Sequence, residues 1–357
     1  MTASAPSTAL PPLSGRERFL RAARRSPVDV APIWMMRQAG RYLPEYRALR
    51  EGTTFMERAR SPEIAAELTL QPIRRFGFDA AVIFSDILVP AAAMGVDVTF
   101  EEKVGPALTP PVRTRADVER LGPFDPDRRT GFLGEAIRRV RGALGDERAI
   151  VGFCGGPWTV AGYLVEGGSS RDFGRLKAML YGEPETFDEL MARLVDAHVP
   201  YLGMQVEAGA DALQIFESWG GELDARTYRA RVLPHLERLT TAAKSLGVPT
   251  IVFCNGGSHL LDVFAEAGPD VLSLDWRADA RAAVARFGDR FALQGNLDPG
   301  ALLAGPEAAA REAHAVLDAF VDAPGHVFNL GAGLTPQVPV ASVQAVVDAV
   351  RSRGRAR

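Results

Sequence analysis

Residues 32–47 read PIWMMRQAGRYLPEYR, a short apolar run that leads directly into two arginines and a glycine. This pattern is typical of a buried strand that ends at a binding site. Arg37 and Arg41 each carry a permanent positive charge on a planar fork of donors, which suits them to carboxylates or phosphates. Two arginines at this spacing also fit a solvated loop when they are taken alone. Within the full stretch, they predict an anionic ligand.

Seven further apolar runs follow along the chain. With residues 33–36 they give eight candidate strands, the others being residues 80–84, 150–154, 212–216, 250–254, 271–274, 291–294 and 327–330. The runs are nearly continuous in apolar residues rather than alternating, as expected for parallel strands that are buried on both faces. Helical patterns lie between them, for example at residues 187–208, 236–246, 260–267, 278–287 and 306–321. The alternation of strand and helix predicts an α/β protein.

Both a (β/α)8 barrel and a doubly wound sheet fit this alternation, but no GxGxxG fingerprint follows the first strand. We therefore expect a single-domain (β/α)8 barrel of the TIM type over residues 16–357. The long, proline-containing connection at residues 89–146 predicts an insertion after the second strand. Residues 1–15 are rich in Ala, Ser, Thr and Pro and lack the apolar core of a signal peptide, so they are expected to form a disordered leader.

The composition argues against several classes of partner. The chain of 357 residues has a formal net charge of −3, with acidic and basic residues interspersed, so no nucleic-acid binding is expected. No apolar run approaches the ~20 residues that span a bilayer, so no membrane association is expected. Cys154 and Cys254 are too few for a disulfide framework and too far apart for a CxxC motif, which indicates a reducing, cytoplasmic setting.

If the barrel is right, the active site gathers the residues that follow the strands. These residues are Arg37, Gln38, Arg41, Ser85, Asp86, Gly155, Gly156, Pro157, Trp158, Glu217, Ser218, Asn255, Asp275, Trp276, Asn296, Asp298, Gly331, Ala332 and Gly333. The carboxylates among them suit Mg²⁺, but the two arginines would compete with a cation for them. Zinc would need a Cys and His cluster, and Cys154 and Cys254 lie inside apolar runs, where a buried small hydrophobe is the usual explanation. We expect no metal.

Three strings on this face resemble the uroporphyrinogen decarboxylase family: RQAGRYLPEYR at residues 37–47, FSDIL at 84–88 and GFCGGPWT at 152–159. Later strings resemble the family's further motifs in the same order, namely YLVEGG at 163–168, FES at 216–218, LDW at 274–276, QGNLDP at 294–299 and NLG at 329–331. The resemblance covers nearly the whole chain past the leader. It implies a homodimeric, cofactor-independent barrel enzyme, a carboxy-lyase of porphyrin and heme biosynthesis. Its reaction would decarboxylate the four acetate side chains of uroporphyrinogen III to methyl groups, giving coproporphyrinogen III.

The resemblance also implies roles for individual residues. The expected substrate-binding residues are Arg37, Gln38, Ala39, Gly40, Arg41, Asp86, Tyr163 and Ser218, and Asp86 and Arg37 are also expected to be catalytic. Asp86 would accept hydrogen bonds from the pyrrole N–H groups and stabilise the positive charge of a ring that is protonated at its α-carbon. Two proton donors stay open. One is Arg37, although an arginine gives up its proton reluctantly, and the other is a water that Arg37 holds.

One position departs from the family pattern. The family usually has a histidine in the last motif, NLGHG, whereas residues 329–333 read NLGAG with Ala332 in its place. Alanine can neither titrate nor hydrogen-bond through its side chain, so a required histidine at this point is not expected. A tetrapyrrole carrier that has lost catalysis remains an alternative. His259 is expected to start a helix, and His326 to open the eighth strand at the end away from the site.

Overall fold

The computed structural model describes residues 11–101 and 105–354. The first ten residues of the predicted leader lie outside these ranges. Its last two residues belong to the start of helix α1 (Gly15–Ala23), where the Ser14 hydroxyl accepts a hydrogen bond from the Glu17 amide at 3.2 Å. An N-terminal serine cap satisfies an amide that has no partner within the helix.

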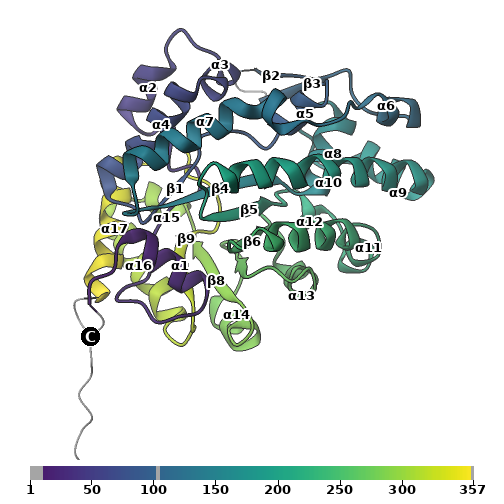
Figure 1. The fold of residues 1–357 in the computed structure, drawn as a ribbon. Helices are drawn as coiled ribbons and strands as arrows, with labels where there is room; N and C mark the ends of the chain where they lie inside the picture. The colour runs from purple at the N-terminus through teal and green to yellow at the C-terminus, as the bar shows by residue number, and fades with distance from the viewer. Residues whose placement is uncertain (1–10, 102–104, 355–357) are drawn as a thin grey trace, which may run out of the picture.

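A parallel sheet of seven strands forms the centre of the protein, in the order β1-β4-β5-β6-β7-β8-β9 (Figure 1). The strands are β1 (Ala80–Val82), β4 (Ala149–Gly155), β5 (Ala212–Phe216), β6 (Thr250–Phe253), β7 (Val271–Ser273), β8 (Ala292–Leu297) and β9 (His326–Leu330). Seven of the eight predicted strands are thereby confirmed, with their ends shifted by at most a few residues. The α/β class is confirmed as well.

The predicted strand at residues 33–36 is wrong in its length, because Ile33 alone forms a parallel bridge, to Phe328 in β9. Trp34 N–H still donates to Phe328 O at 3.3 Å, and the two amides that follow it donate to side chains instead of to strand carbonyls. Met35 N–H donates to Gln38 Oε1 at 3.1 Å, and Met36 N–H donates to Asn329 Oδ1 at 3.0 Å. Side-chain acceptors therefore end the ladder after Trp34.

The sheet is curled, because its two edges approach the same segment. Phe328 N–H in β9 donates to Pro32 O at 2.8 Å, and Asp79 N–H, just before β1, donates to Ile33 O at 2.9 Å. Residues 32 and 33 therefore lie between the first and the last strand of the sheet.

Helices surround the sheet (Figure 1). Five of them lie where the apolar periodicity predicts them: α10 (Pro184–Glu207), α12 (Leu233–Ser245), α13 (Leu261–Glu266), α14 (Ala280–Phe287) and α16 (Pro306–Ala319). The C-terminal helix α17 (Val340–Gly354) packs on α16. Within the described residues, no helix is both long and apolar enough to cross a membrane.

The chain between β1 and β4 forms several elements of its own. They are α5 (Val89–Ala93), an antiparallel pair of β2 (Asp97–Glu101) and β3 (Gly105–Thr109), α6 (Arg115–Arg120) and α7 (Pro126–Leu144). Helix α7 packs against α4 (Pro62–Phe76) and α10. The elements between β1 and β4 lie along the upper part of the view in Figure 1.

Two apolar clusters make the core. The smaller cluster joins alternate residues of the strands to Trp34, Met36 and Phe19, the last of which belongs to α1. Helix α1 also bonds to residues that precede strands: Arg16 N–H donates to Glu147 O at 3.1 Å, and Arg18 pairs with Asp79 at 2.7 Å. Because α1 covers the amino ends of the strands, a ligand is expected at their carboxyl ends, as in other parallel α/β proteins.

Candidate active site

The loop after residue 36 carries the two arginines that the sequence singles out. Arg37 adopts a left-handed backbone conformation, with φ 61°, which is uncommon for a residue other than glycine. Its side chain lies directly against Gly333, where an added Cβ would come within 2.6 Å of Arg37 Cδ. Gly333, in the turn after β9, therefore leaves the space through which the Arg37 side chain passes.

Arg37 and Arg41 are both exposed, and neither forms an ion pair or a side-chain hydrogen bond with any described residue. The backbone N–H groups of Ala39 and Gly40 on the same loop have no hydrogen-bond partner in residues 11–101 and 105–354. The loop thus offers two positive charges and two amide donors, which is the chemistry that binds carboxylates.

Asp86, Arg37 and Tyr163 form the centre of the candidate site. Asp86 follows β1, is partly buried, and its Oδ1 accepts a hydrogen bond from Leu88 N–H at 2.9 Å. Burial raises the pKa of Asp86 to about 6, although the Leu88 N–H group and the charge of Arg37 both act to lower it. Tyr163 lies on α8 (Pro157–Glu166), where burial raises the pKa of its hydroxyl and the charges of Asp86 and Arg37 act on it. The fold thereby brings together three residues that lie far apart in the sequence.

Ser218 and Tyr163 are linked through Trp219. The Trp219 ring lies 6.4 Å from the Tyr163 ring, centroid to centroid, in an edge contact. Ser218 is partly buried, and its hydroxyl makes no hydrogen bond to a described residue. The structure therefore places Ser218 next to the residue that packs on Tyr163, with a free donor.

Gln38 differs from the other predicted substrate-binding residues, because it is fully buried. Its side chain accepts a hydrogen bond from Met35 N–H at 3.1 Å and donates one to Ala80 O at 3.1 Å. Its carbonyl accepts a hydrogen bond from the Tyr42 hydroxyl at 2.8 Å. In this conformation Gln38 shapes the arginine loop and offers a ligand no exposed atom.

Three other residues at strand ends also serve the fold. Asp275 accepts hydrogen bonds from the Ser258 hydroxyl at 2.8 Å and the Arg277 amide at 3.0 Å. Asn296 donates to Asp275 O at 2.9 Å, and Glu217 accepts from the Trp158 amide at 3.1 Å. Both carboxylates and the Asn296 NH2 group already have protein partners. Among the described residues, no group of three or more His, Cys, Asp or Glu side chains could hold a metal ion.

Ala332 is partly buried beside Gly333, so it lies in the turn that Arg37 crosses. The predictions for the two histidines are confirmed. His259 lies in a short 3-10 helix (Ser258–Leu260), where a ring nitrogen is 2.9 Å from Leu223 O. His326 is the first residue of β9 and is buried, with a ring nitrogen 2.8 Å from Gly295 O.

A buried polar network among the strands was not predicted from the sequence. Trp34 Nε1 donates to Gln294 Oε1 at 3.0 Å, and Gln294 Nε2 donates to Gln214 Oε1 at 3.0 Å and to Ser273 Oγ at 2.9 Å. A glutamine inside an otherwise apolar strand run is a signal for such a network, since a buried amide needs partners.

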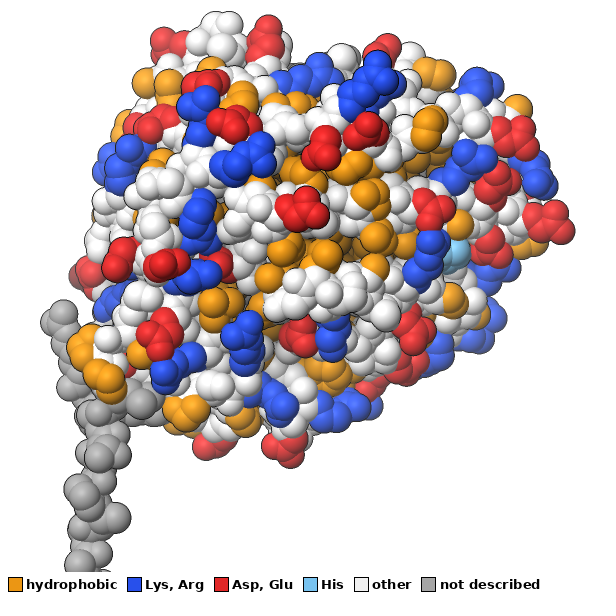
Figure 2. All heavy atoms as spheres, viewed as in Figure 1, with side chains coloured by type: hydrophobic (Ala, Val, Ile, Leu, Met, Phe, Trp, Pro, Cys, Tyr) orange, Lys and Arg blue, Asp and Glu red, His pale blue; other side chains and the backbone are white. Residues whose placement is uncertain are grey.

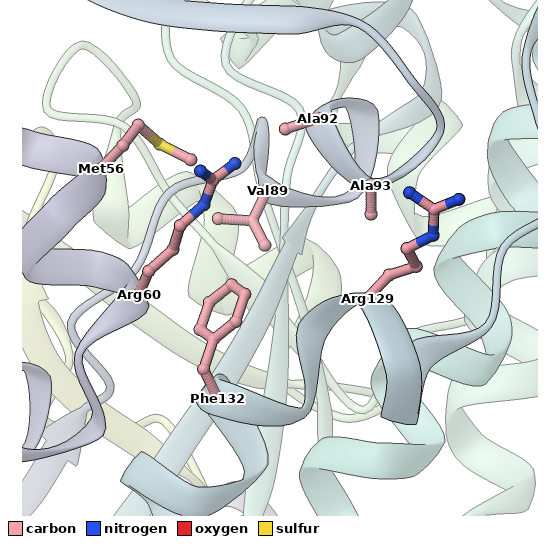
Figure 3. Close-up of a pocket in the computed structure, with 7 residues that line it drawn as sticks. All are labelled: Met56, Arg60, Val89, Ala92, Ala93, Arg129 and Phe132. Carbon is pink, nitrogen blue, oxygen red and sulfur yellow. The ribbon is translucent and has the colours of Figure 1, made fainter.

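A separate cavity of about 260 Å³ lies between α3 (Phe55–Arg60), α5 and α7. Figure 3 shows Arg60 and Arg129 on either side of Val89 and Phe132 in this cavity. It shares no lining residue with the centre around Arg37, Asp86 and Tyr163, and none of its lining residues is acidic. We therefore place the candidate active site at that centre and not in this cavity.

Comparison with known proteins identifies the family of the chain. The profile of the family described as Uroporphyrinogen decarboxylase (URO-D) matches residues 14–353. A protein named uroporphyrinogen decarboxylase from Methylococcus capsulatus is 47% identical over 336 residues, which covers 93% of this chain and 96% of that protein. Another of the same name from Alkalilimnicola ehrlichii is 48% identical and covers 94% of this chain and 93% of its own length.

Among solved structures, a methyltransferase from Methanosarcina mazei shares the fold with a TM-score of 0.82. It is 24% identical and covers 95% of this chain and 99% of its own, so the likeness concerns the fold alone. The profile match and the curated relatives decide the family: the chain belongs to the uroporphyrinogen decarboxylase family.

Proposed function

We propose that this protein is a carboxy-lyase that removes the four acetate carboxyl groups of uroporphyrinogen III, leaving methyl groups and giving coproporphyrinogen III in porphyrin and heme biosynthesis. Family membership supports the reaction. The observation that carries the assignment to this site is the grouping of the exposed Arg37, which forms no ion pair with a described residue, with the partly buried Asp86 and Tyr163. A substrate with eight carboxylates needs fixed cationic donors, and the arginine loop supplies them.

In this proposal Arg37, Arg41 and the amides of Ala39 and Gly40 hold substrate carboxylates, and Tyr163 and Ser218 add hydroxyl donors. Gln38 contributes by holding the loop, because its side chain bonds to Met35 and Ala80.

Asp86 accepts hydrogen bonds from the pyrrole N–H groups in the proposed reaction. The substrate makes its own electron sink when a pyrrole α-carbon is protonated, and the Asp86 carboxylate stabilises the cation that results. Such a preorganised charge typically contributes ~3 kcal/mol. When carbon dioxide leaves, the electrons of the broken C–C bond neutralise the protonated ring and form an exocyclic methylene. A proton then completes the methyl group, and loss of the proton on the α-carbon restores the pyrrole. We assign that proton to a water held by Arg37, and no cofactor takes part.

The finer architecture is also a proposal. We propose that residues 32–36 occupy the first strand position of a single-domain (β/α)8 barrel and close the seven-stranded sheet, with the elements between β1 and β4 as its insertion. Their position between β9 and β1, and the inward location of Trp34 and Met36, support this.

We further propose a cytoplasmic homodimer. Two free, buried cysteines fit a reducing compartment, and Trp276, 40% exposed, and Leu303, 50% exposed, fit an association surface. Analytical ultracentrifugation measures the oligomeric state.

The proposed reaction is tested by anaerobic incubation of chelator-treated protein with uroporphyrinogen III, with the loss of carboxyl groups followed by chromatography. We expect conversion to the four-carboxyl product, reduced by ~100-fold or more in Asp86→Asn. Asp279→Asn is the matched control, because Asp279 is an exposed helix cap whose carboxylate also accepts a backbone amide. Tight substrate binding without turnover would contradict the enzyme and favour a tetrapyrrole carrier, and Ala332→His would then be the variant to examine.

A further inference from the structure

We propose that Glu217 is a positioning residue that fixes the start of α8, and through it Tyr163, against the turn after β5 that carries Ser218. The consequences for the substrate rest on the proposed function, whereas the attachment itself does not. Glu217 is fully buried, so it acts through other residues and touches no ligand.

The Glu217 carboxylate takes the place of the missing side-chain cap of α8. The N-cap residue, Gly156, has no side chain, and the second and third residues of the helix donate to Glu217 instead. Trp158 N–H donates to Oε1 at 3.1 Å, and Thr159 N–H donates to Oε2 at 3.2 Å. A carboxylate at this position satisfies amides that have no partner within the helix and interacts favourably with the helix dipole.

Gly156 is required by this arrangement. A Cβ at that position would lie 1.7 Å from Glu217 Oε2, which leaves no room for any side chain. The glycine therefore lets a carboxylate from a neighbouring strand reach the helix start.

Three further hydrogen bonds join the same two segments. Trp158 Nε1 donates to Trp219 O at 3.0 Å, Trp219 N–H donates to Thr159 Oγ1 at 3.1 Å, and Gly156 N–H donates to Phe216 O at 2.8 Å. Residues 156–159 are thus tied to residues 216–219 on both sides of Ser218. Because α8 is only ten residues long, a shift at its start is expected to reach Tyr163.

The hydrogen-bond pattern suits the ionised form of Glu217. Its partners are all donors, since the Tyr228 hydroxyl of α11 (Ala225–Arg231) also donates to Oε1, at 3.0 Å. The other titratable groups that face it are Cys154 of β4 and Cys254 after β6, and burial raises the pKa of both thiols and of Tyr228, so all three stay neutral. Burial also raises the pKa of Glu217, to about 7. The attachment is therefore strongest above pH 7 and weakens as Glu217 gains a proton below it.

Glu217→Gln tests the proposal, because a glutamine of the same shape must turn an NH2 group toward a helix amide. The control is Asp211→Asn: Asp211 precedes β5 as Glu217 follows it, is also buried, and accepts Ile150 N–H at 2.8 Å at the opposite end of the strand. With uroporphyrinogen III, we expect roughly a tenfold or larger rise of KM in Glu217→Gln. The control should lose thermal stability and keep its KM within about twofold.

A second, less disruptive variant keeps the test valid if the Glu217→Gln protein does not fold. Thr159→Val removes only the hydroxyl that accepts Trp219 N–H, and a KM rise of roughly threefold is expected. Equal KM values in wild type, Glu217→Gln and Thr159→Val would overturn the proposal.

A second readout needs no catalysis. Trp158 and Trp219 both belong to the attachment, so tryptophan fluorescence is expected to titrate with a midpoint near pH 7 in the wild type and to lose that step in Glu217→Gln. A step that persists in Glu217→Gln would refute the role of Glu217. If the wild type shows this step but does not turn over substrate, the proposed function fails while the attachment stands.

Discussion

At the residue scale, Asp86 combines a proposed catalytic role with a cost to folding. Burial raises the pKa of Asp86 from 3.8 to about 6, so the folded state holds its proton more tightly than the unfolded state. Stability that depends on this proton is present below pH 4 and is lost as the pH rises to 6. We expect Asp86→Asn to be more stable than the wild type by ~2 kcal/mol at pH 8, and equal to it near pH 3.5, in denaturant titrations. A less stable variant at pH 8 would contradict this.

The same pKa sets an expected limit on activity. If the ionised Asp86 carboxylate stabilises the substrate cation, kcat/KM falls below pH 6 as this carboxylate is protonated. This fall is measured from kcat/KM of the wild type between pH 5 and 8. A kcat/KM that stays constant across pH 6 would exclude an essential charge on Asp86.

Gly333 gives a second residue-scale prediction. An added Cβ would lie 2.6 Å from Cδ and 2.9 Å from Cγ of Arg37, so Gly333→Ala must displace the arginine side chain. Because the clash involves a flexible side chain, we expect roughly a tenfold loss of kcat/KM with little change in Tm. Gly142→Ala is the control, since no atom lies within 4 Å of the added Cβ there. An unchanged kcat/KM in Gly333→Ala would contradict a role of the Arg37 side chain in the reaction.

At the scale of elements, Asp79 connects helices α1 and α17 to Ile33. Its carboxylate pairs with Arg18 of α1 at 2.7 Å and with Arg351 of α17 at 2.8 Å, and it accepts Ile33 N–H at 2.7 Å. Removing the charge leaves buried donors with weaker partners, so Asp79→Asn is expected to lower the free energy of unfolding by ~3 kcal/mol. Glu266→Gln, which breaks a half-exposed pair with Arg229, should cost less than ~1 kcal/mol. Similar losses in the two variants would argue against this role.

At the scale of the whole molecule, the proposed barrel depends on residues 32–34 bridging β9 and β1. The amides of Phe328 and Asp79 donate to this segment at 2.8 Å and 2.9 Å, and both are buried. In a closed barrel they exchange hydrogen as slowly as Leu213 N–H inside the sheet, which donates to Pro249 O at 2.9 Å. The Ala39 amide, which has no hydrogen-bond partner among the described residues, should exchange fast. Exchange of Phe328 as fast as that of Ala39 would indicate an open sheet.

The face shown in Figure 2 carries acidic and basic side chains interspersed, in agreement with the small net charge. A surface of this kind gives no extended field of one sign for a nucleic-acid backbone. The concentration of positive charge that the proposed function needs is local, on the arginine loop.

The sequence by itself determined the strands and the family. Parallel strands buried on both faces are continuous apolar runs, and seven of these runs became strands because the signal is local to each run. The motifs around Arg37, Asp86 and Tyr163 could also be recognised from the sequence, because each is a short contiguous string.

The tertiary structure decided what each strand-end residue does, because that depends on partners far away in the chain. The Gln38 side chain is buried against β1, since its amide donates to Ala80 O. Residues 35 and 36 do not pair with a neighbouring strand, because their amides donate to the side-chain oxygens of Gln38 and Asn329. Glu217 is a cap for a helix that begins 60 residues earlier in the chain, and burial, which no local pattern encodes, sets the pKa of Glu217 and of Asp86.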